Sequence, residues 1–206
     1  MQYPPSTRRN IHKRPTSTSK KHRQRTIILV SLLVGGIFGY ETATYRYAAQ
    51  AALASANAVV QVRFSPGGNC TQFTEAAIAK AKKTILVQAY YFTSLPIADA
   101  LIKAHRRGVE VSMLIDRSQL TGKYAQVRHM NEQGIFIAVD KVPGIAHSKV
   151  MVIDDDYVLT GSFNWTKAAE TSNVENILLI KDHKTNHIYT TAWRQRAEQA
   201  QVVTDW

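Results

Sequence analysis

The chain has 206 residues, enough for one domain with extensions but too few for two full domains. Apolar residues make up 45%, the usual share of a globular protein, which excludes a wholly disordered chain. The single cysteine, Cys70, excludes an intrachain disulfide and a zinc site built on several thiolates. The net charge of +11 points to a nucleic-acid partner until its distribution along the chain is considered.

Most of the positive charge lies at the N-terminus. Residues 1–25 hold eight Lys and Arg, no acidic residue, and many Ser, Thr and Pro, so we expect a disordered basic tail. Residues 59–206 hold 17 basic against 14 acidic residues, a net charge of only +3. The charge of the whole chain therefore describes its tail more than a binding surface of the folded part.

An uncharged stretch, TIILVSLLVGGIFGY, follows the tail at residues 26–40. Its 15 residues are short for a bilayer span but fit the apolar core of a signal peptide. Extended to residue 45, the segment can instead remain as an anchor. The basic residues before it orient the N-terminus to the cytoplasm. Small residues at 54–58 offer cleavage sites, but they lie far beyond the apolar core, so we favour the anchor.

Both interpretations place the folded domain outside the cytoplasm. An anchor at residues 26–45 tethers it on the periplasmic side of the inner membrane, whereas a cleaved signal leaves it secreted. Residues 46–58, which are rich in Ala, are expected to form a helical spacer. The folded domain is expected to occupy residues 59–206.

Strands and helices alternate in the first part of this domain. Strands rich in β-branched and aromatic residues are expected at 59–66, 84–92, 109–116 and 135–140. Helices are expected at 70–83, from the N-cap Ser94 to Gly108, and from the N-cap Thr121 to Gly134. The alternation predicts an α/β domain with a largely parallel sheet. The pattern then changes to a hairpin at 147–160, a strand at 173–180 and a helix at about 183–201.

Polar residues flank the predicted hairpin. His147 and Lys149 are two apart and therefore share one face of a strand. Ser162 and Asn164, beyond the turn, are again two apart. A hairpin that turns near Asp155 brings the four together. One point then holds an imidazole, an ammonium, a hydroxyl and an amide.

These groups suit the chemistry of a phosphodiester. Lys149 supplies positive charge for the phosphoryl oxygens, while Ser162 and Asn164 donate hydrogen bonds as negative charge builds on them. Gly161 removes a side chain where the backbone must approach the ligand. A neutral imidazole can attack phosphorus and form a covalent intermediate. Glu175, on the next strand, can orient an imidazole and set its tautomer.

The spacing H-x-K-x4-D-x6-G-S-x-N resembles the signature of the phospholipase D superfamily. The residues that match it are His147, Lys149, Asp154, Gly161, Ser162 and Asn164. The resemblance covers about residues 59–203 and extends to the small bacterial endonucleases of that superfamily. It implies an α/β/α sandwich around a mixed sheet. It also implies catalysis through a phosphohistidine, with no metal and no cofactor.

The resemblance further implies how the roles are divided. In the superfamily one histidine attacks phosphorus, and a histidine of a second motif protonates the leaving oxygen and later activates water. This chain has one motif, so we expect a homodimer with one shared active site. Glu175 matches the acid that partners a histidine. Asp154 is expected to be structural and ranks below the others.

Three functions remain open on the sequence. The first is a non-specific endonuclease on DNA or RNA, favoured by the compact chain with a single motif. The second is a phospholipase D that hydrolyses phospholipid head groups, favoured by the membrane-proximal segment. The lack of an obvious exposed apolar loop counts against it. The third is a non-catalytic nucleic-acid-binding module, which the intact set of site residues disfavours.

Simpler explanations cover the remaining polar clusters. Asp154–Asp156 is expected to be a solvated turn rather than a metal site. His183 and His187 have a spacing that permits metal binding, but no third ligand is in sight. Lys123, Arg128 and His129 form either a basic rim for nucleic acid or a solvated helix face.

Overall fold

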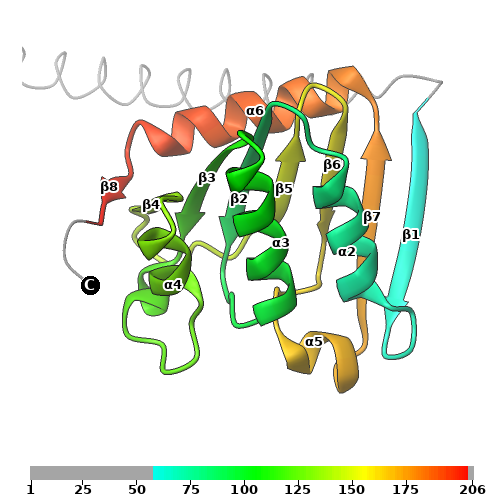
Figure 1. Ribbon diagram of the computed structural model, residues 1–206, viewed down its shortest axis with the longest axis horizontal. Helices are drawn as coiled ribbons and strands as arrows, with labels where there is room; N and C mark the ends of the chain where they lie inside the picture. Colours follow the sequence, from blue (N-terminus) through cyan, green and yellow to red (C-terminus); the bar gives the residue numbers. More distant parts are fainter. Residues whose placement is uncertain (1–57, 204–206) are drawn as a thin grey trace, which may run out of the picture. The chain divides into compact units, whose positions relative to one another are not determined.

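A computed structural model of the chain describes residues 58–203, which form one eight-stranded sheet with helices on both faces (Figure 1). The predicted tail, the apolar segment and almost all of the spacer lie outside the described residues. Within residues 58–203, no helix is both long and apolar enough to cross a membrane.

The strands are β1 (Val59–Ser65), β2 (Thr84–Ala89), β3 (Glu110–Ile115), β4 (Phe136–Val139), β5 (Lys149–Ile153), β6 (Tyr157–Gly161), β7 (Glu175–Lys181) and β8 (Gln201–Val202). The helices are α2 (Cys70–Ala79), α3 (Leu95–Arg106), α4 (Val127–Glu132), α5 (Lys167–Thr171) and α6 (His183–Ala197), with a 3-10 helix, η1 (Arg117–Leu120).

The sheet is mixed, with the strand order β1-β7-β6-β5-β2-β3-β4-β8. Only β2–β3 and β3–β4 pair in parallel, and the other five pairings are antiparallel. The expectation of an α/β fold with a mixed sheet is confirmed, but the expectation of a largely parallel sheet is wrong. Among strands that are hydrogen-bonded neighbours, only β2, β3 and β4 are joined by crossover connections, whereas β5 and β6 form a hairpin.

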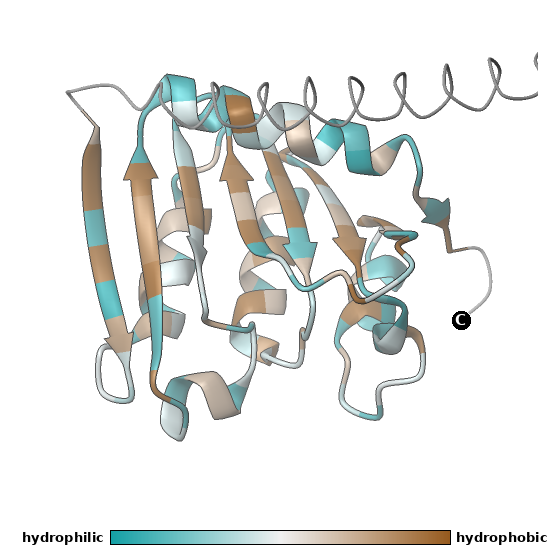
Figure 2. Ribbon diagram, turned by 180° about the vertical axis from the view of Figure 1, so that it is seen from behind, coloured by the Kyte–Doolittle hydropathy of each residue, from teal (hydrophilic) through white to brown (hydrophobic). Residues whose placement is uncertain are grey.

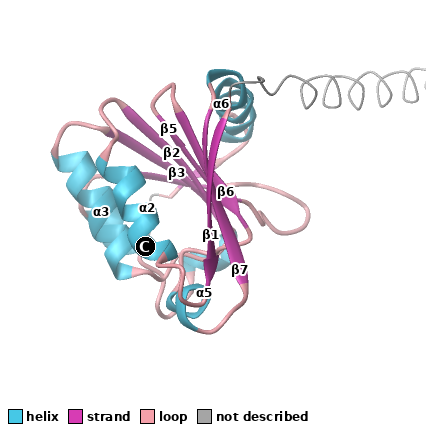
Figure 3. Ribbon diagram, turned by 90° about the vertical axis from the view of Figure 1, so that its right-hand side faces the viewer, coloured by secondary structure: helices cyan, strands magenta, loops and turns pink. Residues whose placement is uncertain are grey.

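The helices lie in two layers (Figure 3). On one side α2 and α3 cover the sheet, and α6 lies across the other side. The main apolar core lies under the first layer and includes Ile78, Leu101 and Met113. On the other face, Trp193 of α6 packs on Leu114 and donates a hydrogen bond from Nε1 to the carbonyl of Val87 at 2.9 Å. Figure 2 shows apolar residues concentrated in the central strands and α6 largely hydrophilic.

Two predicted helices differ from the structure. The first ends at Ala79 rather than at residue 83, because the carboxylate of Asp154 accepts the backbone N–H groups of Lys82 and Lys83. The third does not begin at Thr121. Asp116 instead caps η1 through the N–H of Ser118, and α4 begins only at residue 127.

The second predicted helix is confirmed. Ser94 stands at the N-cap of α3, although its side chain makes no capping hydrogen bond. The helix stops before Gly108, which has a φ of +90°. The final helix ends at Ala197, before the short strand β8 that the sequence pattern did not indicate. The hairpin is confirmed as β5 and β6.

Candidate active site

His147 lies at the N-terminal end of β5 and is exposed. Its ring packs against that of Tyr90, with the ring centroids 4.5 Å apart. The backbone N–H of Tyr90 donates to the carbonyl of Ser148 at 3.1 Å, so Tyr90 contacts both the ring of His147 and the backbone of the next residue. The imidazole is therefore held in position while it stays accessible to solvent.

Lys149 is the first residue of β5 and only 6% exposed. Its Nζ donates to the carbonyl of His147 at 2.7 Å and lies 5.0 Å from the centre of the Tyr90 ring. Burial lowers the pKa of Lys149, while the negative charge of Glu175 acts in the opposite direction. The ammonium is thus a partly desolvated positive charge beside the imidazole, which strengthens its attraction for an anionic phosphoryl group.

Ser162 and Glu175 face each other across β6 and β7. Ser162 Oγ donates to Glu175 Oε2 at 2.5 Å and accepts the backbone N–H of Asn176 at 3.1 Å. The other carboxylate oxygen accepts from Asn173 at 3.0 Å. In the described chain the carboxylate of Glu175 is therefore bonded to a serine and an asparagine. The predicted contact with a histidine stays a prediction.

Gly161 makes room for protein backbone. A Cβ on this residue would lie 2.3 Å from the carbonyl oxygen of Asn176. That carbonyl accepts the backbone N–H groups of Ser162 and Phe163 at 3.1 and 3.2 Å, which turns the chain out of β6. The close approach to β7 is a second reason for this glycine, and its close approach to a ligand stays a prediction.

Asn164 follows that turn, and one polar atom of its side chain is unpaired in the described part of the chain. Its side-chain Oδ1 is buried and, among the described residues, has no hydrogen-bond partner. An amide oxygen only accepts hydrogen bonds, so Oδ1 does not itself bind the anionic phosphoryl oxygens. The group of this side chain that can donate to a phosphodiester is its Nδ2 amide.

These residues line one open pocket of about 580 Å³. Its walls contain the residues predicted to form the site, which are His147, Lys149, Gly161, Ser162, Asn164 and Glu175. The sequence analysis missed two tyrosines. Tyr189 lines the pocket from α6, and Tyr90 supports the imidazole from the end of β2. Neither belongs to the motif, and no spacing within the sequence relates them to it.

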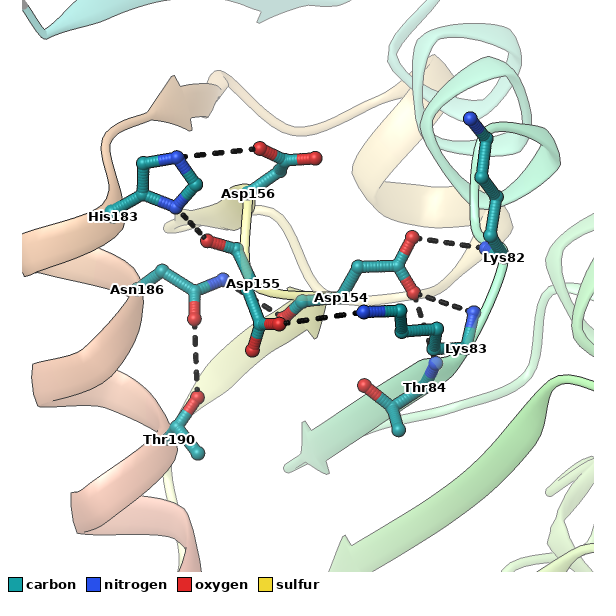
Figure 4. Close-up of polar contacts among 9 residues, drawn as sticks. All are labelled: Lys82, Lys83, Thr84, Asp154, Asp155, Asp156, His183, Asn186 and Thr190. Atoms are coloured by element: carbon teal, nitrogen blue, oxygen red, sulfur yellow. Dashed lines mark hydrogen bonds and ion pairs between the residues drawn. The ribbon is translucent and has the colours of Figure 1, made fainter.

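Asp154 is the one motif residue that does not line the pocket. It lies in the turn at the opposite end of β5, and its carboxylate accepts the backbone N–H groups of Lys82, Lys83 and Thr84 at 2.7–2.9 Å (Figure 4). Its φ is +49°, in the left-handed region that Asp tolerates better than most residues. The geometry gives Asp154 a role in joining the hairpin to β2.

A metal centre has no ligand set in the part of the chain that the structure describes. No group of three or more His, Cys, Asp or Glu side chains converges between residues 58 and 203. The turn residues Asp155 and Asp156 are engaged by Lys83 and His183 (Figure 4). Nearby, His183 Nδ1 lies 2.6 Å from the carbonyl oxygen of Asp155. This cluster joins the hairpin turn to α6.

Comparison with known proteins matches a family model to residues 75–196, and the model is described as "Cardiolipin synthase, PLD-like domain". A phospholipase D of Rickettsia prowazekii is 36% identical over 180 residues, which cover 87% of this chain and 87% of that protein. A phospholipase D of Rickettsia conorii is 42% identical over 137 residues, covering 66% of this chain and 68% of that protein.

Solved structures agree with these matches. Nuc of Salmonella typhimurium, described as a phospholipase D family member, is 36% identical with a TM-score of 0.68, covering 72% of this chain and all of that one. NucT of Helicobacter pylori has a TM-score of 0.62 over 70% of this chain and all of that one. At 21% identity, this second likeness shows the fold alone.

Proposed function

The chain belongs to the phospholipase D superfamily and is a phosphodiesterase, and we propose that it hydrolyses the head-group ester of phospholipids. The observation that carries this proposal is a set of exposed apolar side chains that lie within two residues of site residues along the chain. The relatives named phospholipase D support the same choice. The endonuclease, which the sequence favoured, becomes the second candidate.

The apolar side chains come from three separate loops. Ile145, 55% exposed, stands two residues before His147, and Val174, 88% exposed, directly precedes Glu175. Tyr91, 42% exposed, follows the tyrosine that supports the imidazole. We call these three residues the apolar rim. No single loop is apolar, as the sequence led us to expect, but each of the three loops contributes one exposed apolar residue to the rim.

The apolar rim gives the site a means of meeting a lipid surface. Side chains that expose apolar area in water gain free energy when they enter the boundary between head groups and acyl chains. A lipid phosphodiester lies at that boundary. Contact between the rim and a bilayer therefore brings the phosphodiester toward Lys149 and His147.

The proposed reaction proceeds in two displacements. A ring nitrogen of His147 attacks phosphorus, the N–P bond forms, and the bond from phosphorus to the head-group oxygen breaks. A second imidazole gives its proton to that leaving oxygen and then removes a proton from water. The water oxygen attacks phosphorus, the N–P bond breaks, and phosphatidate leaves. Lys149 and the Nδ2 amide of Asn164 stabilise the charge on the phosphoryl oxygens in both steps, and Ser162 joins them only when its hydroxyl turns from Glu175 to the phosphoryl group.

The second imidazole must come from outside the described chain. His147 is the only histidine among the described residues that line the pocket. We propose that a second copy of the chain packs against the pocket, so that the partner subunit's His147 supplies the proton. In such a dimer one shared site uses both copies of the motif.

An apolar patch on the α6 side of the sheet supports this dimer. The guanidinium of Arg63 packs over Phe73 of α2, so its neighbours Val62 and Phe64 on β1 point to the opposite face, toward the α6 side. Both are exposed, at 41% and 62%. Val150, an apolar core residue of the α6 side, also lines the pocket. A second copy that covers the patch therefore packs on the face of the sheet that also holds the pocket.

A nuclease remains the second candidate because of one exposed segment. Lys123, Tyr124 and Arg128 lie in and after the loop that follows η1, and this loop is at the same end of the sheet as the start of β5 (Figure 1). Tyr124 is 68% exposed, with the Lys123 ammonium 5.4 Å from the centre of its ring. A cation beside an exposed aromatic ring suits single-stranded nucleic acid, which stacks its bases and offers phosphates.

The location outside the cytoplasm is part of the same proposal. It rests on the apolar segment at residues 26–45 and the basic residues before it. A tether there holds the pocket near its lipid substrate. Fractionation and protease protection of the full chain in cells test it, and a full-length protein recovered in the cytosol would contradict it.

The substrate is tested by incubating the full chain, in EDTA, with phosphatidylcholine vesicles, plasmid DNA and RNA. The His147→Ala variant is the matched control. Choline released by the wild type alone supports the phospholipase. Nucleic acid cleaved without choline release replaces it with the nuclease. Activity that disappears in EDTA and returns with a divalent cation contradicts the metal-free mechanism.

The shared site is tested by subunit mixing. An excess of His147→Ala should suppress wild-type activity, because mixed dimers hold one imidazole instead of two. An active protein that sediments as a monomer, with activity unaffected by the variant, would contradict the dimer. Phe64→Asp should weaken association, while Leu95→Asp on α3, at a side chain exposed to a similar degree, should not.

A further inference from the structure

A second pocket, of about 660 Å³, lies between η1, the chain that leaves β4, and β8. Most of its wall is apolar and is formed by Leu120, Val139, Val142, Pro143, Val202 and Val203. Leu120 and Val202 are 41% and 51% exposed, so they offer apolar area that a ligand can bury. The volume lies within the range of small-molecule sites.

The carboxylates of this pocket are already bonded. Asp116 accepts backbone N–H groups from Ser118 at 2.9 Å and from Ala146 at 2.8 Å. Asp140 is paired with the guanidinium of Arg196 from α6. Both carboxylates are at least 90% buried, at 2% and 7% exposure. They are therefore occupied within the fold rather than presented to a ligand.

The cations of the pocket, unlike its carboxylates, are accessible to a ligand. Arg117 and Lys141 line it, and both are exposed. The guanidinium of Arg117 makes one hydrogen bond, of 3.3 Å, to the carbonyl of Gly144, which leaves most of its donors available. An apolar wall with two accessible cations complements a ligand that has a long apolar chain and an anionic head.

We propose that this pocket binds an anionic lipid, with its acyl chain against the apolar wall and its head group at Arg117 and Lys141. Phosphatidate, the product class of the proposed reaction, has this chemistry. The connection to catalysis rests on the proposed function, whereas the lipid class follows from the pocket itself. The pocket is distinct from the active-site pocket, since no residue lines both.

The wall of this pocket also holds the chain that leads to His147. Asp116 binds the N–H of Ala146, and Arg117 binds the carbonyl of Gly144. An anionic head group can use the remaining donors of Arg117, so it binds next to the chain segment that leads to His147.

Binding is tested with dodecyl phosphate, a soluble alkyl monoester, titrated into the full chain by calorimetry below its micelle concentration. Octyl phosphate and dodecanol serve as the shorter-chain and uncharged probes. Affinity should rise by up to about fourfold for each buried methylene. Equal affinity for dodecanol would overturn the anionic part of the proposal, and equal affinity for octyl phosphate the acyl-chain part.

Matched variants show where the probe binds. Leu120→Asp should weaken dodecyl phosphate about tenfold by placing a charge in the apolar wall, whereas Leu95→Asp on α3 should leave it unchanged. Lys141→Glu should weaken it about threefold to fivefold, and Lys103→Glu on α3 should not. Wild-type affinity in both pocket variants would overturn the proposal, because the probe would then bind elsewhere.

The same samples are assayed for hydrolysis of a soluble phosphodiester and of phosphatidylcholine. Soluble-diester activity of the pocket variants reports that they are folded. If phosphatidylcholine is not hydrolysed but the variants lose probe binding, the proposed function fails while the lipid pocket stands. If phosphatidylcholine is hydrolysed and the variants bind normally, the pocket proposal fails alone.

Discussion

The carboxylate of Asp116 accepts the backbone N–H of Ala146 at 2.8 Å and so holds the chain one residue before His147. Its other oxygen accepts the N–H of Ser118 at 2.9 Å. Burial acts to raise the pKa of Asp116, but the hydrogen bonds from Ser118 and Ala146, together with the charge of Arg117, outweigh it and lower the pKa. The carboxylate is therefore ionised at neutral pH. It joins the end of β3 to the loop that carries His147, which we call the imidazole loop.

Asp116→Asn should lower kcat while changing KM little. An amide has one acceptor oxygen, so one of the two backbone N–H groups loses its partner and the imidazole loop is less well held. Misplacing a reacting group by about 1 Å can cost on the order of 100-fold in rate, and we expect a loss of about 10- to 100-fold. Steady-state kinetics on a soluble phosphodiester measure it.

Asp99→Asn on α3 is the control, since it makes the same chemical change away from the pocket. It should retain wild-type kinetics. Circular dichroism at the assay temperature should show both variants folded. Wild-type kcat in Asp116→Asn would show that the hydrogen bond to Ala146 does not position the imidazole.

The pH dependence of activity should reveal the burial of Lys149. Because the pKa of this ammonium lies below its ordinary value of 10.5, the alkaline limb of kcat/KM should fall at a pH below 10.5. Glu175 acts to raise that pKa, so Glu175→Gln should move the limb to still lower pH. The pH at the midpoint of this limb does not depend on the maximal value of kcat/KM, so the midpoint can be measured even in a variant with low residual activity.

The same group makes a linked contribution to stability. Between its folded pKa and 10.5 the unfolded chain binds more protons at Lys149, so this contribution rises with pH in that window.

The control for the pH profile is Glu198→Gln, an exposed change near the end of α6, which should leave the alkaline limb of kcat/KM in place. A limb unchanged by Glu175→Gln would mean that the carboxylate does not influence the ammonium.

The part of the site that the sequence predicts is the part that lies on the hairpin. Residues two apart on paired strands have fixed relative positions, so His147, Lys149 and Ser162 could be brought together from spacing alone. Tyr90 and Tyr189 could not, because they reach the site from β2 and α6. Their position depends on how separate elements pack, and local pattern carries no information about that.

The same distinction explains the errors in the fold. The strands were located because each has a local β-branched pattern, but their order and direction depend on long-range pairing. β8 has two residues, and only its pairing with β4 makes it a strand. The end of α2 was misplaced because a carboxylate more than 70 residues away, that of Asp154, captures the N–H groups of Lys82 and Lys83.

Asp154→Ala should lower stability rather than catalysis. The substitution leaves three backbone N–H groups, those of Lys82, Lys83 and Thr84, without their acceptor, and it places alanine at a φ of +49°. A hydrogen bond to a charged group contributes roughly 1.5–3 kcal/mol, and the exposed N–H groups can turn to water. We therefore expect the free energy of unfolding to fall by about 2–4 kcal/mol.

Asp155→Ala is the matched control for this change. Its carboxylate is 86% exposed and makes one ion pair, of 3.9 Å, with Lys83, so its loss should be almost neutral. Urea denaturation measures both stabilities, and kcat is measured well below the midpoint of unfolding. A stable but inactive Asp154→Ala would assign this residue a part in catalysis that its position does not show.

Gly161→Ala should disrupt both the sheet and the site. The added Cβ would lie 2.3 Å from the carbonyl oxygen of Asn176, and backbone cannot yield as a flexible side chain does. β6 and β7 must then separate, which moves Ser162 away from Glu175. We expect a stability loss of about 1–3 kcal/mol and a large loss of kcat. Gly144→Ala, whose Cβ would meet nothing within 4 Å, is the control and should change neither quantity. If Gly161→Ala kept wild-type stability and kcat, the β6–β7 contact would not be what positions Ser162.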